Sequence, residues 1–229
     1  MSAPNLRFSV ANTVNRLQTN YLDRPESTEG SEARRVLAEL RKSAAREFGT
    51  DPLALERVLS TLTPPLSEGE LGRGDAPSPS ESAAYYALTL FAAHMQSATT
   101  PAHTEERTFA MACGRLQATS ESGSLKARFD AMQTAREESS RLIHLRTLVS
   151  LLKGEKLAFD YGALAADLRS LQNPARRDGV LLRWGRDYAV GMLRPSQQDS
   201  PLTESDSSDH PVPTCLLYTS DAADDLLTV

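Results

Sequence analysis

The hydrophobic residues of this chain recur with the period of an α-helix over much of its length. The clearest stretch is HLRTLVSLLKGEKLAFDYGALAADLRSL, residues 144–171, together with Leu142 just before it. Apolar residues follow one another three or four positions apart, a break occurs at Gly154, and the same spacing resumes after Asp160. Residues with this period lie on one face of a helix. The stretch therefore predicts two consecutive helices over about 138–171.

Other parts of the chain show the same period between recognisable helix ends. Asp51 followed by Pro52 is typical of a helix N-terminus, and Asn173 with Pro174 opens the last helix in the same way. Strand signals are scarce, so we expect an all-α bundle of about eight helices, with two packed sub-bundles as an alternative arrangement. The predicted helices outside 138–171 are one that ends before Pro25, one from Ser31 to Phe48, one over 52–62, one over 81–97, one capped by Thr104, one that starts near Leu125 and one from Pro174.

Changes in composition divide the chain into segments. Residues 63–80 are rich in proline and glycine and are predicted to link the N-terminal helices, 1–62, to a C-terminal helical bundle, 81–194. Residues 195–229 begin with a stretch rich in proline, serine and aspartate, and we predict a disordered tail. Its last part, 215–229, opens with CLLYTSDAAD, which resembles one reading frame of a sequencing-library adaptor. We expect 215–229 to be such an artefact, with an acidic tail of natural origin as the alternative.

Charge is distributed unevenly along the chain. The formal net charge is −5, but residues 195–229 hold seven Asp/Glu and no Lys/Arg. Residues 1–194 therefore hold 25 Lys/Arg against 23 Asp/Glu, a net charge of +2. Ten of these cations lie within 141–194, where only five Asp/Glu accompany them. The part of the chain that is predicted to fold is mildly basic, with its cations concentrated late.

Composition also limits the class of protein. The chain is 40% hydrophobic and 24% charged, as expected of a soluble globular protein. No apolar run approaches the roughly 20 residues that a membrane span needs, so no membrane contact is expected. Two cysteines, Cys113 and Cys215, make no disulfide framework, and a reducing cytoplasm is the expected location.

Candidate catalytic or metal-binding residues are few. His94 lies in the most apolar predicted helix, where a core histidine with one hydrogen bond is favoured over a ligand. His94, His103 and Cys113 lack the paired spacings of zinc sites. Cys113 falls between Phe109 and Leu116 on an apolar stripe, which favours packing over nucleophilic attack. We therefore expect no catalytic residue, no metal and no cofactor.

Lysine and arginine residues gather on the polar faces of several predicted helices. In the helix from Ser31, five cations that include Arg46 lie opposite the apolar stripe. Arg146 and Lys153 are seven residues apart and follow one edge of their helix. For one helix alone, a solvated basic face is the simpler interpretation, but several such faces favour a polyanion as partner. The cations expected to contact it are Arg34, Arg35, Arg41, Lys42, Lys126, Arg128, Arg141, Arg146, Lys153 and Arg183.

The composition also indicates how a polyanion would be bound. Aromatic residues make up only 6% of the chain, and most occupy apolar stripes, so stacking of bases on exposed rings is not expected. Contacts from arginine and lysine to phosphates would be independent of base sequence and sensitive to salt. A net charge of +2 over 1–194 is too small for a tight stand-alone binder, which indicates a contributor to a larger assembly.

Several segments, in the order in which they occur, resemble the CasB family of proteins. Members of this family are the small subunit of the type I-E CRISPR Cascade complex. The resemblance covers about 31–190, with one departure, Ala110, where the family commonly has a glycine, and a 63–80 linker that is longer than expected. The segments that carry it are ARRVLAELRK, DPLALERVLSTL, AAYYALTLFAAHMQ, RTFAMACGRL, KARFDAM, LIHLRTLVSLLKGEKLAFDYGALAADL and RWGRDY.

This resemblance implies a non-catalytic helical subunit, present as two copies beside the backbone subunits and the large subunit of a guide-RNA complex. Its basic surface would stabilise the R-loop through the nucleic-acid backbone, including the displaced strand of the target DNA. Among the candidate residues we rank the group Arg141, Arg146 and Lys153 first and the face of Arg34, Arg35, Arg41 and Lys42 second. The competing hypothesis is a helical adaptor that binds an acidic protein partner, and an enzyme is the third.

Overall fold

The computed structural model describes residues 5–44, 52–120 and 123–193, all of which lie in one compact unit, Met1–Pro195. This described part contains nine α-helices and no β-strand, so the prediction of an all-α fold is confirmed. The helices are α1 (Leu6–Asp23), α2 (Thr28–Ala44), α3 (Pro52–Thr61), α4 (Pro79–His94), α5 (Phe109–Thr119), α6 (Ser124–Thr134), α7 (Glu138–Gly154), α8 (Tyr161–Leu171) and α9 (Pro174–Leu193).

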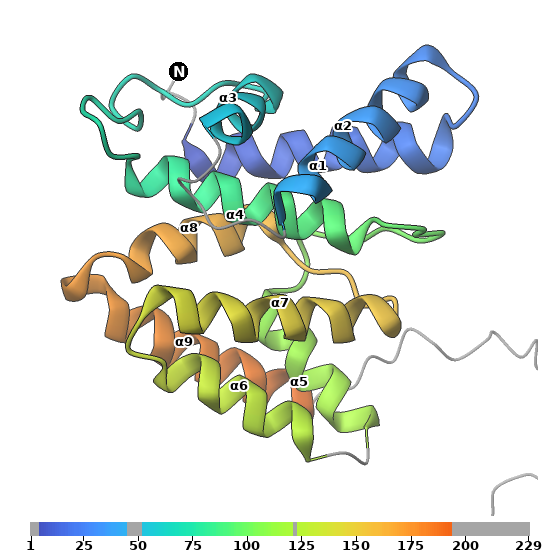
Figure 1. Ribbon diagram of the computed structural model, residues 1–229. Coiled ribbons are helices and arrows are strands. Elements are labelled where there is room, and N and C mark those ends of the chain that lie inside the picture. The colour runs from blue at the N-terminus through green and yellow to red at the C-terminus, as the bar shows by residue number, and fades with distance from the viewer. Residues whose placement is uncertain (1–4, 45–51, 121–122, 194–229) are drawn as a thin grey trace, which may run out of the picture. The chain divides into compact units, whose positions relative to one another are not determined.

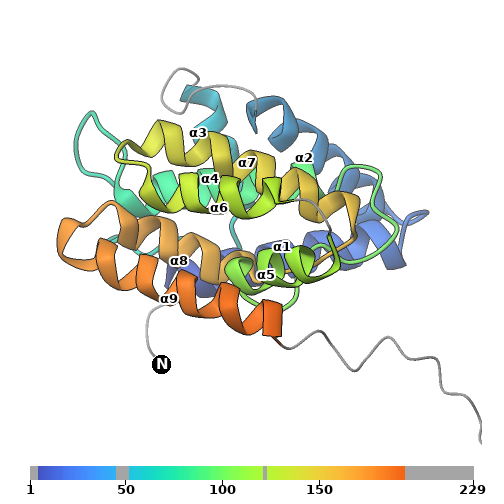
Figure 2. The ribbon, with the colours of Figure 1, turned by 90° about the horizontal axis from the view of Figure 1, so that it is seen from below.

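Helix α4 lies at the centre of the unit. Its sequence is apolar on all sides and nearly all of its residues are buried, as expected of a helix that neighbours enclose. Helices α1, α2 and α3 pack against it on one side, and α7 and α8 pack on the other (Figure 1). Figures 1 and 2 show α6 alongside α7 and α9 alongside α8. The N-terminal helices therefore share one core with the C-terminal ones.

A capping box fixes the start of α4. The Ser78 hydroxyl accepts a hydrogen bond from the amide of Glu81 at 3.1 Å, and the Glu81 carboxylate accepts one from the amide of Ser78 at 2.6 Å. Pro79 occupies the first helical position, where a missing N–H costs nothing. The same Glu81 carboxylate also accepts from the amide of Gly72 at 3.1 Å, so it ties the preceding proline- and glycine-rich segment to the helix.

Helices α5 and α9 cross at unusually close range because glycine stands on both sides of the contact. A Cβ atom on Gly114 of α5 would lie 2.1 Å from the carbonyl oxygen of Tyr188 in α9. A Cβ atom on Gly191 of α9 would lie 2.2 Å from the carbonyl oxygen of Met111 in α5. Neither position has room for a side chain, so the sequence of both helices is constrained by their crossing.

Two predicted helix starts were wrong. Helix α5 begins at Phe109 with Thr108, not Thr104, as its N-cap. The segment before it is held by backbone hydrogen bonds to the residues between α7 and α8: the Thr104 amide donates to the Phe159 carbonyl at 3.3 Å, and the Asp160 amide donates to the Arg107 carbonyl at 2.7 Å. These backbone bonds compete with helix formation.

Helix α2 begins at Thr28, three residues before the predicted Ser31, because the Ser27 hydroxyl accepts from the amide of Gly30 at 3.0 Å. Helix α3 begins at Pro52, as predicted. The proposed cap Asp51, and Arg46 and Phe48 of the preceding stretch, lie outside the described residues.

Candidate nucleic-acid interface

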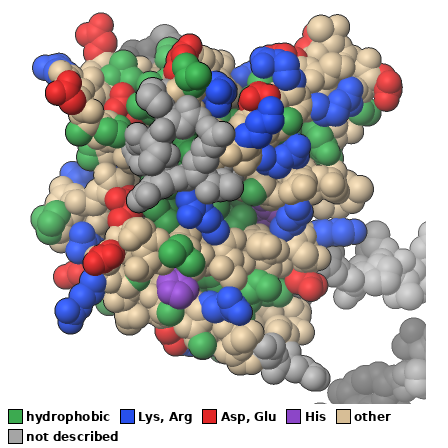
Figure 3. Space-filling view, in the orientation of Figure 1, with side chains coloured by type: hydrophobic (Ala, Val, Ile, Leu, Met, Phe, Trp, Pro, Cys, Tyr) green, Lys and Arg blue, Asp and Glu red, His purple; other side chains and the backbone are tan. Residues whose placement is uncertain are grey.

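The predicted basic face of α2 is exposed, but acidic residues accompany its cations. Figure 3 shows lysine and arginine side chains over this part of the surface with acidic ones among them. Arg35 donates two hydrogen bonds to Glu32, at 2.8 and 2.6 Å, and the Lys42 ammonium lies 2.7 Å from the Glu39 carboxylate. Arg34 donates to the Pro25 carbonyl at 2.6 Å and to Ser31; Arg41 is half-buried. Within the described residues this face is therefore partly neutralised.

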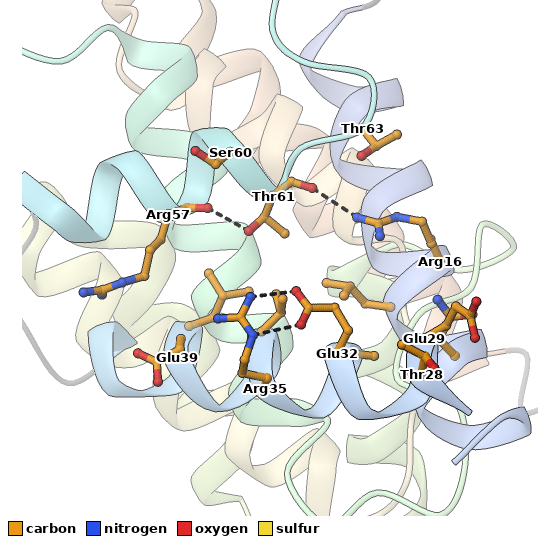
Figure 4. Close-up of a pocket in the computed structure, with 15 residues that line it drawn as sticks. Arg16, Thr28, Glu29, Glu32, Arg35, Glu39, Arg57, Ser60, Thr61 and Thr63 are labelled. Carbon is orange, nitrogen blue, oxygen red and sulfur yellow. Dashed lines mark hydrogen bonds and ion pairs between the residues drawn. The ribbon is translucent and has the colours of Figure 1, made fainter. Parts of the chain in front are cut away.

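A cleft of about 680 Å³ separates α2 from α1 and α3, and charges of both signs line it. Figure 4 shows Arg16 of α1, Arg35 of α2 and Arg57 of α3 around it, with glutamates of α2 between them. Apolar side chains, Leu17 and Leu40 among them, complete the lining. Mixed charge over an apolar lining suits a protein segment better than a polyanion. Sequence reasoning did not single out Arg16 or Arg57, because only the packing of three helices brings them together.

Arg141, which was expected at the cationic edge of α7, is instead buried, with 4% of its surface exposed. Its guanidinium donates to the carbonyl of Ala135, the residue that follows α6. Burial, followed by the nearby charge of Arg177, lowers the pKa of Arg141. The sequence contains the reason: Leu145 and Leu148 follow at i+4 and i+7, so Arg141 lies within the apolar stripe.

Arg146 and Lys153 do lie together on α7, and both are half-buried. Lys156, exposed just beyond the helix, extends the row. We call these three residues the α7 edge. Lys153 and Lys156 both line a small cavity of about 80 Å³ beside His94. None of the three forms an ion pair with any residue that the structure describes, so no salt bridge there has to be broken before they meet an anion.

The other predicted cations lie on α6 and α9. The Lys126 ammonium is 2.5 Å from the Asp130 carboxylate and 5.8 Å from the centre of the Tyr188 ring, and Arg128 is exposed on the same helix. Arg183 of α9 forms an ion pair with Asp167 of α8. The same carboxylate accepts a hydrogen bond from the indole of the next residue, Trp184, at 2.6 Å. These two neighbours in the RWGRDY segment therefore hold α9 onto α8.

The buried histidines have structural partners. The His94 ring nitrogen Nδ1 lies 2.9 Å from the Tyr161 hydroxyl, and burial, with a smaller contribution from Lys153, lowers the pKa of His94 to about 4. This confirms His94 as a core histidine with one hydrogen bond. His103 Nδ1 accepts from the Tyr161 amide at 3.2 Å. Cys113 is fully buried, and burial raises the pKa of its thiol, so packing is its role.

Two other kinds of site are absent from the described residues. No three His, Cys, Asp or Glu side chains gather closely enough there to hold a metal ion. None of the helices in the same ranges has the length and apolar character to cross a membrane.

Together, the fold and the surface define a class: an all-α protein in which, among the residues described, cations without ion-pair partners lie along α7. Comparison with known proteins identifies the family. The model of the family described as CRISPR-associated protein Cse2 matches residues 36–188, so the chain belongs to the Cse2 family. The resemblance to CasB proteins, read from the sequence segments, is thereby confirmed.

Three solved structures are similar. CasB from Thermobifida fusca is 27% identical, and the match covers 82% of this chain and 99% of that one, with a TM-score of 0.61. A CRISPR-associated protein of the Cse2 family from Thermus thermophilus is 25% identical, with coverage of 83% and 99% and a TM-score of 0.57. CasB from M. ruber is 18% identical, with coverage of 79% and 96% and a TM-score of 0.50, and it supports the fold alone. No curated protein matched.

Proposed function

We propose that this chain is the non-catalytic small subunit of a type I-E Cascade complex, in which it stabilises the R-loop by contacting the nucleic-acid backbone. The observation that carries the proposal is the α7 edge, defined above, on a member of the Cse2 family. Its cations form no ion pair within the described residues, whereas two of the α2 cations, Arg35 and Lys42, do. A phosphate would therefore meet less competition at the α7 edge than on α2.

The energetics of an R-loop suit such a weak and sequence-independent contact. The duplex of guide RNA and target strand is about as stable as the DNA duplex that it replaces, so the exchange is nearly balanced. Three cations that neutralise phosphates of a displaced strand would change the logarithm of the binding constant by about −2 for each tenfold rise in salt. Specificity would remain with base pairing, and the protein would lengthen the lifetime of the open state.

The proposal includes the partners that the family suggests. These are two copies of this chain, the backbone and large subunits, the guide RNA and the target DNA with its displaced strand. Cleavage would belong to another protein, in keeping with a site that offers only phosphate contacts. The complex would work in the cytoplasm, where Cys113 needs no disulfide partner.

Reconstitution tests this function. The chain is added to a type I-E complex that lacks its small subunit, and the R-loop lifetime is measured at two salt concentrations. We expect the wild-type chain to lengthen the lifetime, more so at low salt, and the double variant Arg146→Glu/Lys153→Glu to enter the complex without this effect. The control, Arg24→Glu/Arg73→Glu, reverses two exposed cations elsewhere and should behave as wild type. An α7-edge variant with an unchanged lifetime would refute the proposed contact.

A scaffolding role is the second candidate, and the cleft between α1, α2 and α3 favours it. Its mixed charges and apolar lining suit a segment of another subunit. In the same reconstitution, the variant Arg16→Glu/Arg57→Glu would then fail to enter the complex, while the α7-edge variant would still enter. If both variants enter and only the α7-edge variant shortens the lifetime, the cleft has no part in assembly.

A further inference from the structure

Two arginines meet at a pocket where the start of α7, the end of α8 and the start of α9 come together. The pocket has a volume of about 230 Å³, and Arg141 and Arg177 line it with Glu138, Gln172 and leucines of α7 and α8. A water molecule occupies about 30 Å³ in the liquid, so the pocket has room for a group of several heavy atoms. None of the residues of the α7 edge lines it.

Both guanidinium groups are held in place by carbonyls at helix ends. Arg141 donates to the Ala135 carbonyl at the end of α6, and Arg177 Nε donates to the Leu171 carbonyl at the end of α8, at 3.1 Å. An arginine has five N–H donors in a rigid plane, so each group keeps donors beyond these bonds. Arg141 Nε is buried and has no hydrogen-bond partner among the described residues.

The charge of the pocket is positive. The only carboxylate among its described lining residues, Glu138, accepts a hydrogen bond from the Gln172 amide at 3.2 Å and is exposed. Two arginines against one glutamate leave one positive charge. The charge of Arg177 lowers the pKa of Arg141 after the larger effect of burial, which means that the two cations repel each other across the pocket. A bound anion would relieve that repulsion.

The geometry points to a binding site for a single phosphate group in this pocket. Guanidinium groups that approach from two helices suit an anion with three or four oxygens, whereas a single arginine can bind both oxygens of a carboxylate. Helix α7 starts at the pocket with Glu137 as its N-cap, and the Glu137 side chain accepts no hydrogen bond from the amides of the first turn. The partial positive charge of that helix end favours an anion as well.

Binding of inorganic phosphate to the full chain tests the site. Affinity is measured by calorimetry at constant ionic strength, with chloride replaced by phosphate. We expect saturable binding and a thermal midpoint that rises with phosphate concentration. Arg177→Gln should weaken binding about tenfold or more, because it removes charge-assisted hydrogen bonds. Arg176→Gln is the matched control, since Arg176 is the preceding residue, is exposed and does not line the pocket; it should bind as wild type.

Three results would overturn the inference. Phosphate that does not bind saturably, or that binds equally to the Arg177→Gln variant, would mean that the two arginines serve only as caps of helix ends. Formate that binds as tightly as phosphate at the same ionic strength would assign the pocket to a carboxylate, such as an acidic side chain of a protein partner. Arg141→Gln is a second variant, but Arg141 is buried and its replacement could impair folding. The test therefore rests on Arg177→Gln.

A labelled single-stranded oligonucleotide then separates two sources of the phosphate. If Arg177→Gln weakens oligonucleotide binding along with phosphate binding, the site takes a phosphate of the nucleic-acid backbone. If oligonucleotide binding is unchanged while phosphate binding is lost, the site takes free phosphate. Both results support the site. The α7 edge shares no residue with the pocket. A negative result in the phosphate experiment therefore does not affect the proposed R-loop contact, and a negative result for that contact does not affect the proposed phosphate site.

Discussion

The close crossing of α5 and α9 predicts opposite effects for the same substitution at two positions of one helix. In Gly191→Ala the new Cβ would lie 2.2 Å from the carbonyl oxygen of Met111, 3.0 Å from its carbonyl carbon and 3.1 Å from the amide nitrogen of Arg115. All three are backbone atoms, so no side-chain rotation relieves the contact. In Gly179→Ala the new Cβ meets nothing within 4 Å.

The magnitudes follow from these distances. Carbon and oxygen atoms in close contact are about 3.3 Å apart, so α5 and α9 would have to separate by about 1 Å at Gly191. Overpacking of this kind costs about 1–3 kcal/mol, and it would loosen the contact of Trp184 with Phe109, whose ring centres are 5.8 Å apart. At Gly179 only helix propensity changes, which stabilises the folded state by up to about 1 kcal/mol.

Chemical denaturation of both variants and of wild type measures the difference. We expect the free energy of unfolding to fall for Gly191→Ala and to rise for Gly179→Ala. Near the thermal midpoint, 1 kcal/mol corresponds to about 2–4 °C for a domain of this size, so calorimetry gives a second readout. A Gly191→Ala protein as stable as the Gly179→Ala protein would show that the two helices are not in backbone contact there.

Three further predictions concern the core and its caps. Burial lowers the pKa of His94 from its ordinary value of 6.5 to about 4, so the unfolded chain binds a proton at His94 before the folded chain does as the pH falls. The free energy of unfolding should therefore decrease between about pH 6.5 and 4, by about 3 kcal/mol in total. The difference between wild type and His94→Gln in pH-dependent denaturation would isolate this contribution. Tyr161→Phe removes the 2.9 Å hydrogen bond to His94 and should lower the free energy of unfolding by about 1–2 kcal/mol, whereas a loss below about 0.3 kcal/mol would mean that this bond contributes little. Asp160→Ala removes the N-cap bond to the Ala163 amide at 2.8 Å and the ion pair with Arg7 at 2.9 Å. We expect the free energy of unfolding, measured by chemical denaturation, to fall by about 1–2 kcal/mol. Asp160→Asn keeps a capping oxygen and should recover most of this loss.

Local sequence determined the helices and most of their ends. The apolar period predicted α7 and α8 with the break between them, because side chains at i, i+3, i+4 and i+7 share a face whatever that face packs against. Capping chemistry is equally local, and Pro52 and Pro174 begin their helices as predicted. The start of α5 was missed at Thr104 because backbone pairing with the segment before α8 joins residues that lie far apart in the sequence.

The candidate site shows the same division. The sequence places Arg146 and Lys153 on one edge of α7, and it also places Arg141 in the apolar row with Leu145 and Leu148, a signal that the cationic pattern obscured. Whether a cation is neutralised depends on its neighbours in space.

Arg183 meets Asp167 of another helix, and Arg141 approaches Arg177 of another. Periodicity reports which side chains share a face of one helix, and the ion pairs of α2 and α6 lie at that local spacing. Clefts, pockets and ion pairs such as Arg183–Asp167 arise between helices. The composition of a surface and the ion pairs within one helix were therefore readable from the sequence. Tertiary packing decided the burial of Arg141, the pockets and the ion pairs between helices, because these join residues that lie far apart along the chain.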